Sequence, residues 1–259
     1  MRHSPVSPAP SGGGAPPLVA VAHGSRDPRA AATVEGLLAA VRARRPGLRV
    51  VTSYLDHAPP SPVQALGALA EDGGAVVLPL LLTAAYHSKT DIPRVLAEVG
   101  RRHPRLAVRY GDPLGPHPLL IEALERRLAE AGTPVGDGGT AVVLVSAGSS
   151  DPGANGVIAR LAHGWRRRGW YDVVPAYASA ARPTPAEAVR ALRAAGAPRV
   201  AVASYFLAPG YFADKVRAGA LHAGADVVSP VLGAAPELAD IVLRRYDEAL
   251  LDVRPAAVG

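Results

Sequence analysis

The chain of 259 residues carries a formal net charge of +6, and its 49% hydrophobic and 19% charged residues are typical of a globular protein. It contains no cysteine, which excludes disulfides, iron–sulfur clusters, zinc ribbons and thiol nucleophiles. The excess of positive charge favours acidic partners. Its basic residues are scattered and few aromatic residues accompany them, so we expect no nucleic-acid partner.

The first 17 residues lack the apolar core of a secretory signal, so we expect residues 1–17 to form a disordered tail. No apolar run in the sequence is long enough to span a bilayer. These observations predict no membrane partner and a cytoplasmic location.

From residue 18 onward, short apolar runs alternate with helical patterns. The expected strands, in chain order, cover 18–22, 48–55, 75–82 and 106–110. The expected helices that follow them cover about 28–45, a stretch from about 61, 91–102 and 118–132. Near-continuous apolar runs between helices indicate buried parallel strands, so the pattern predicts an α/β fold.

The same pattern begins again after the turn-rich segment 132–139. The stretch "AVVLVSAGSSDP" (141–152) repeats "LVAVAHGSRDP" (18–28). Likewise, "AYASAARPTPAEAV" (176–189) repeats "SYLDHAPPSPVQAL" (53–66) at a nearly constant offset.

This repetition predicts a tandem duplication into two similar lobes. We expect an N-terminal lobe over 18–132 that carries the active site and a degenerate C-terminal lobe over 140–253. Each lobe should contain a parallel sheet of about four strands flanked by helices.

Polar residues of the first lobe lie just after its expected strands. His23 follows the first strand, Asp56 follows the second with His57 beside it, and His87 follows the third. The carboxyl ends of parallel strands meet at one edge of an open sheet, where ligands bind. Two imidazoles and a carboxylate at that edge can hold a divalent metal and leave coordination positions open.

The second lobe lacks these three candidate ligands. The positions of His23, Asp56 and His87 correspond to Ala147, Ser179 and Gly210. Residues kept in both copies suit folding, whereas residues present in one copy suit a single site. The sequence therefore predicts one metal site, in the first lobe.

The segment "GSRDP" has two interpretations. Ser25 and the backbone N–H groups at a helix start could bind an anion, and Arg26 and Lys89 could bind substrate carboxylates. The interpretation that we favour is a helix N-cap at Asp27, repeated at Asp151 in the second lobe.

Four stretches together resemble the sirohydrochlorin chelatases, the CbiX/SirB group of class II chelatases, in their two-lobed form: "VAHGSRDP", "YLDHAPPSP", "LPLLLTAAYHSKTDIP" and "DPLGPHP". The resemblance covers nearly the whole chain from about residue 18. It implies insertion of ferrous or cobaltous ion into sirohydrochlorin, with His23 and His87 as metal ligands. The family usually has glutamate where this chain has Asp56, so either Asp56 or His57 could be the third ligand.

This resemblance favours ferrous iron and siroheme biosynthesis, because the chain lacks the histidine-rich or cysteine-containing tail of some cobalt-associated relatives. The implied metal is a substrate, and no permanently bound cofactor is expected. Nitrogen and oxygen ligands release a metal more readily than thiolates do, and the many carboxylates of sirohydrochlorin suit a positively charged protein. No Walker-type loop is present, so ATP should not be needed.

Two alternatives remain: a sirohydrochlorin cobaltochelatase for cobalamin biosynthesis, and a non-catalytic carrier of metal or tetrapyrrole. A histidine phosphatase is disfavoured because Ala22 stands where such enzymes need an arginine before the histidine. Because a fused duplication can replace a dimer of single lobes, we expect a monomer with two pseudo-symmetric lobes.

Overall fold

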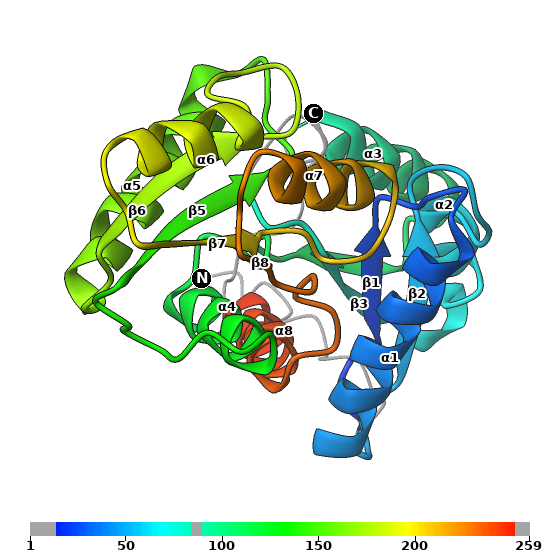
Figure 1. Ribbon diagram of the computed structural model, residues 1–259. Helices are drawn as coiled ribbons and strands as arrows, with labels where there is room; N and C mark the ends of the chain where they lie inside the picture. The colour runs from blue at the N-terminus through cyan, green and yellow to red at the C-terminus, as the bar shows by residue number, and fades with distance from the viewer. Residues whose placement is uncertain (1–13, 84–89, 252–259) are drawn as a thin grey trace, which may run out of the picture.

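The computed structural model describes residues 14–83 and 90–251 (Figure 1). The first lobe contains these elements in order: β1 (Leu18–Ala22), α1 (Pro28–Arg44), β2 (Val50–Tyr54), α2 (Pro62–Gly67), β3 (Gly74–Pro79), α3 (Ile92–Arg102), β4 (Ala107–Tyr110) and α4 (Pro118–Glu130). The second lobe contains β5 (Thr140–Ser146), α5 (Pro152–Trp165), β6 (Asp172–Tyr177), α6 (Pro185–Ala194), β7 (Arg199–Ser204), α7 (Tyr211–His222), β8 (Val227–Val228) and α8 (Pro236–Leu251). None of the helices in the described ranges is both long and apolar enough to cross a membrane.

The two lobes share one sheet topology. The strand orders are β2-β1-β3-β4 and β6-β5-β7-β8, and every neighbouring pair is parallel. Helices flank both sheets (Figure 1). The predicted α/β architecture of two duplicated four-stranded lobes is therefore confirmed.

Equivalent side chains begin equivalent helices in the two lobes. Asp27 accepts a hydrogen bond from the Arg29 N–H, and Asp151 accepts one from the Gly153 N–H. These contacts confirm the favoured N-cap interpretation of "GSRDP" and "GSSDP", in which proline follows as the first helical residue. Capping boxes begin the next helix of each lobe, at Ser61 and at Thr184.

The helix expected from about residue 61 is shorter than its pattern suggests. It ends at Gly67, and a 3₁₀ turn over Ala70–Asp72 follows. Gly73 then takes a left-handed conformation with φ +75°, which leads the chain directly into β3. Glycine tolerates that conformation because it has no Cβ.

The lobes pack against each other through an exchange of their last helices. Helix α8 packs on α1, α4 and the first-lobe strand β3, while α4 packs on the second-lobe strand β7. An ion pair of 2.6 Å joins Arg126 on α4 to Glu237 on α8. One buried apolar cluster includes strand residues from both sheets, such as Leu18 and Val142. This shared core holds the two sheets in a fixed relation, and each sheet packs a second cluster on its other face.

Candidate functional site

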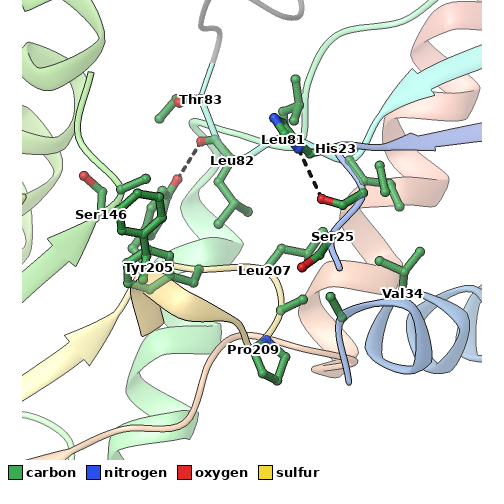
Figure 2. A pocket seen from close by; sticks show the side chains of 18 of the residues that line it. His23, Ser25, Val34, Leu81, Leu82, Thr83, Ser146, Tyr205, Leu207 and Pro209 are labelled. Carbon is green, nitrogen blue, oxygen red and sulfur yellow. Dashed lines mark hydrogen bonds between the residues drawn. The ribbon is translucent and has the colours of Figure 1, made fainter. Parts of the chain in front are cut away.

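A cleft of about 520 Å³ lies between the two lobes, at the carboxyl ends of their central strands. Its walls come from the segments that follow β1 and β3 in the first lobe and β5 and β7 in the second (Figure 2). This is the edge at which open parallel sheets bind ligands.

Apolar side chains at related positions line much of the cleft. Val34 on α1 and Ile158 on α5 hold equivalent positions in the duplicated pattern and both are almost fully buried. Leu82 and Leu207, after β3 and β7, line the cleft from the first and the second lobe (Figure 2). An apolar cleft with a few polar groups at its edge is the usual form of a small-molecule site.

A hydrogen bond joins the two lobes inside the cleft. The Tyr205 hydroxyl, from the segment after β7, donates to the Leu82 carbonyl oxygen at 2.9 Å (Figure 2). Burial raises the pKa of Tyr205, so the hydroxyl keeps its proton throughout the neutral range. A Cβ at Gly115 would lie 2.0 Å from the same carbonyl oxygen, so this crowded contact requires glycine there.

His23 follows β1 and lines the cleft from the first-lobe side, with its side chain exposed. Its Nδ1 lies 3.2 Å from the Gly24 carbonyl oxygen. In the tautomer with the proton on Nδ1, this contact is a hydrogen bond donated to that oxygen, and Nε2 carries the lone pair that a metal ligand needs.

The backbone at Gly24 fixes where His23 lies. Gly24 has φ +91°, and a Cβ there would lie 1.8 Å from the Asp56 carbonyl oxygen. The Asp56 N–H in turn donates to the His23 carbonyl oxygen at 3.0 Å. Gly148 and Ser179 repeat both features in the second lobe, around Ala147, so the loop geometry is a property of the fold and only the imidazole is unique to the first lobe.

A second hollow, of about 580 Å³, adjoins the cleft and shares His23 with it. Arg26 and His57 line this hollow from the first lobe, and Tyr211 lines it from the second. Ser25 lines both hollows, and its hydroxyl accepts a hydrogen bond from the Asp27 N–H at 3.1 Å. The structure thus gathers His23, Ser25, Arg26 and His57 at one site.

Asp56 contacts His57 of that group but lines neither hollow itself. Its carboxylate accepts a hydrogen bond from the His57 N–H at 2.8 Å and lies 3.3 Å from His57 Nε2. The Asp56 side chain is 63% exposed and lines neither hollow, whereas that of His57 is 32% exposed and lines the second. Of the two residues considered for the third metal ligand, His57 is the one at the hollow.

The predicted site residues His87 and Lys89 lie outside the described residues. Within the ranges 14–83 and 90–251, the structure assembles no group of three or more histidine, aspartate or glutamate side chains that could hold a metal ion. The metal site predicted from His23, Asp56 and His87 therefore stays a prediction.

Sequence reasoning missed four aromatic residues of the second-lobe wall: Tyr205, Phe206, Tyr211 and Phe212. Their signal was present in "SYFLAPGYF", which concentrates aromatic residues after β7 in a chain with only 5% aromatic content.

Two parallel sheets of the same topology, with a cleft between their carboxyl edges, define a duplicated, two-lobed class of α/β protein. The family model described as CbiX matches residues 17–131 and matches again over residues 141–249. The chain belongs to the CbiX family, which accounts for both of its lobes.

The sequence is similar to curated enzymes of both metal types. It is 31% identical to a sirohydrochlorin cobaltochelatase of Priestia megaterium over 197 residues, which cover 73% of this chain and 63% of that protein. It is 29% identical to a sirohydrochlorin ferrochelatase of the same organism over 167 residues, which cover 63% and 62% of the two chains. The alignments thus span less than two thirds of the length of these relatives.

Solved structures agree with this relationship. SirB from Bacillus subtilis with Fe³⁺ matches with a TM-score of 0.80 and 25% identity, covering 90% of this chain and 94% of that one. SirB from Bacillus subtilis subspecies spizizenii in complex with cobalt matches with a TM-score of 0.76 at 23% identity, covering 91% and 95% of the two chains, and so supports the fold.

Proposed function

We propose that the protein is a sirohydrochlorin chelatase, which inserts a divalent metal into sirohydrochlorin without ATP. The cleft between the two lobes carries this proposal, because it presents one imidazole-bearing wall and one apolar wall at the carboxyl edges of two CbiX-type sheets. Relatives named for the same reaction support it.

The proposed metal ligands are His23 and His87, with Asp56 or His57 as the third. In the tautomer with the proton on Nδ1, the contact between Nδ1 and the Gly24 carbonyl oxygen would orient the His23 ring. Support for His57 as the third ligand is that it lines the second hollow with His23, and the Asp56 carboxylate beside it would orient its ring. Imidazole and carboxylate hold a first-row divalent ion less tightly than thiolate does, which suits a metal that must be delivered.

Insertion also requires two pyrrole N–H protons to leave the macrocycle. A neutral imidazole or a carboxylate close to the ring can accept them. Ser25, Arg26 and Lys89 are the proposed partners of the substrate carboxylates, since a guanidinium or ammonium group forms charge-assisted hydrogen bonds to a carboxylate.

Ferrous iron and siroheme biosynthesis are the favoured metal and pathway. The second candidate is cobalt insertion for cobalamin biosynthesis, which the relative named as a cobaltochelatase supports. A non-catalytic carrier would use the same residues but would not accelerate insertion. We propose that the protein acts as a monomer, because its two lobes supply both walls of the cleft.

The test is anaerobic metal insertion into sirohydrochlorin, followed by absorbance, with Fe²⁺ and Co²⁺ in parallel. Wild type should exceed the uncatalysed rate, and His23→Ala and His87→Ala should each return the rate close to that baseline. His163→Ala is the matched control, because His163 is an exposed histidine in the last turn of α5 and lines neither hollow. A wild-type rate equal to the uncatalysed rate would exclude a chelatase and favour a non-catalytic carrier. If wild type does accelerate insertion, the metal that is inserted faster would indicate the pathway.

A further inference from the structure

Two neighbouring aromatic side chains at the start of α7 are exposed at the second hollow, beside the cleft. Tyr211 is 72% exposed and Phe212 is 41% exposed. Their rings meet edge to face, with centroids 5.5 Å apart and an interplanar angle of 65°. The other large apolar side chains exposed in the described parts of the chain, such as Leu221, line neither hollow. Exposed apolar area gathered at a cleft indicates a binding surface.

This aromatic pair lies across the site from the first-lobe residues. Phe212 lines both hollows, as His23 does. The backbone just before the pair approaches the first lobe closely, since a Cβ at Gly210 would lie 4.0 Å from the Ser25 hydroxyl oxygen. Asp214, two residues after Phe212, forms a 2.6 Å ion pair with Arg29 of the first lobe. Contacts with the first lobe just before and just after the aromatic pair therefore hold Tyr211 and Phe212 opposite His23.

The duplicated pattern sets this aromatic pair apart in the sequence. His87 corresponds to Gly210, so Tyr211 and Phe212 correspond to Ser88 and Lys89, neither of which is aromatic. The first lobe carries an imidazole after β1 where the second has Ala147, and the second lobe carries the aromatic pair after β7. A division of labour between metal and macrocycle accounts for both differences.

Positive groups border the aromatic pair. The Lys215 ammonium lies 5.9 Å from the centre of the Tyr211 ring. Arg26 lines the second hollow beside Tyr211. Exposed aromatic rings with cations beside them complement a flat conjugated ring that carries carboxylates around its perimeter, because an aromatic face can stack on the ring while the cations pair with the carboxylates.

We propose that Tyr211 and Phe212 form the platform on which the tetrapyrrole ring lies, with its peripheral carboxylates directed toward Arg26 and Lys215. This inference rests on the proposed function and assigns recognition of the macrocycle to the second lobe. On this platform one face of the ring meets the aromatic pair, and the other face is turned toward His23.

The experiment measures binding of metal-free sirohydrochlorin to the full chain by fluorescence, beside binding of Co²⁺ alone by calorimetry. Phe212→Ala should weaken sirohydrochlorin binding by about tenfold, the order expected for loss of one aromatic stacking contact. Phe212→Trp should restore it, and Co²⁺ binding should stay at the wild-type level in both variants. Leu221→Ala, which removes a side chain of similar exposure (43%) from the last turn of the same helix, should change neither measurement.

The outcomes separate this inference from the proposed function. If wild type binds sirohydrochlorin and accelerates insertion while Phe212→Ala binds it equally well, the platform is wrong and the chelatase proposal stands. Equal losses in Phe212→Ala and Leu221→Ala, or a loss of Co²⁺ binding in Phe212→Ala, would also overturn the platform, because either result indicates a structural role. Failure of wild type to bind sirohydrochlorin would overturn both proposals.

Discussion

The guanidinium of Arg29 on α1 lies 2.6 Å from the carboxylate of Asp214 on α7 and joins the two lobes beside the cleft. Arg29 also pairs with Asp27, the N-cap of its own helix, at 2.5 Å. Hydrogen bonds from Arg29 lower the pKa of Asp27, and hydrogen bonds to Asp27 and Asp214 raise that of Arg29. Asp27 and Arg29 therefore stay charged near neutral pH. Because both partners of the link between the lobes are more than half exposed, solvent and salt can weaken it.

The first prediction concerns this link. Asp214→Asn should weaken sirohydrochlorin binding only slightly, on the order of twofold to fivefold, because an exposed ion pair contributes little. The loss should shrink in about 1 M salt, where charges are screened within a few ångströms. A double-mutant cycle with Arg29→Gln, measured at low and high salt, checks this. Equal and additive losses at both salt concentrations would show that the two side chains act independently.

The second prediction compares two glycines at equivalent positions. Gly24→Ala and Gly148→Ala should both destabilise the protein by about 1–3 kcal/mol or more. Each position has a left-handed backbone, and the added Cβ would lie 1.8 Å or 2.0 Å from a carbonyl oxygen. Only Gly24→Ala should also weaken Co²⁺ binding, since only its loop carries an imidazole. Thermal unfolding and calorimetry provide the two measurements. If Gly148→Ala weakened Co²⁺ binding as much, the proposed ligand role of His23 would lose its support.

The duplication could be predicted from the sequence because equivalent side chains make the same local contacts in both lobes. Asp27 and Asp151 cap helices, and Ser61 and Thr184 form capping boxes, all within a few residues of the contacts they make. The alternation of apolar runs and helices then fixes the order of the elements, and the parallel topology follows from it. Short-range chemistry of this kind is visible in a single sequence.

The residues that line the cleft could not be predicted from the sequence, because they are brought together by contacts between residues more than a hundred positions apart in the chain. Tyr205 reaches Leu82, and α8 crosses to cover the first-lobe sheet. Asp56 illustrates the limit at short range as well. Its position after β2 was predicted, but its carboxylate is held by a hydrogen bond from the His57 N–H, which the strand pattern does not show. A sequence pattern can place a residue at the carboxyl edge of a sheet, but it does not show the direction in which the side chain points.

The third prediction concerns Asn155, which holds the second-lobe loop that corresponds to the His23 loop. Its side-chain oxygen accepts from the Ser149 N–H at 3.0 Å, and its nitrogen donates to the Ser149 carbonyl at 2.7 Å. Asn155→Ala, which introduces the residue found at the equivalent position 31, should lower the free energy of unfolding by about 1–2 kcal/mol. Denaturant unfolding measures this change.

A milder variant at the same position provides the control. Asn155→Asp keeps an acceptor for the Ser149 N–H but loses the donor, so its loss of stability should fall between wild type and alanine. Both variants should retain wild-type Co²⁺ binding, because Asn155 lies in the lobe without the imidazole. If Asn155→Ala had the same free energy of unfolding as wild type, water would replace both hydrogen bonds without loss of stability, and the prediction would be wrong.

The fourth prediction concerns pH and His117, the N-cap of α4. Its Nδ1 accepts a hydrogen bond from the Leu119 N–H at 3.2 Å, which requires an unprotonated nitrogen. Burial, together with the nearby positive charges of Arg245 and Arg244, lowers the pKa of His117 below its ordinary value of 6.5, despite the opposing carboxylates of Glu248 and Glu122. The cap and the lowered pKa thus both favour the neutral imidazole.

The direction of the pH effect follows from this lowered pKa. In mildly acidic solution the unfolded chain binds a proton at His117 more readily than the folded chain does. The stability that neutral His117 contributes is therefore complete above its unfolded pKa and is lost as the pH falls through its folded pKa. His117→Asn keeps a capping acceptor that does not titrate. Between about pH 7.5 and pH 5, wild type should lose more unfolding free energy than His117→Asn, by about 1 kcal/mol or less because solvent screens this partly buried group. Urea unfolding of both proteins across that range measures the difference, and parallel pH profiles would show that His117 is not the group responsible.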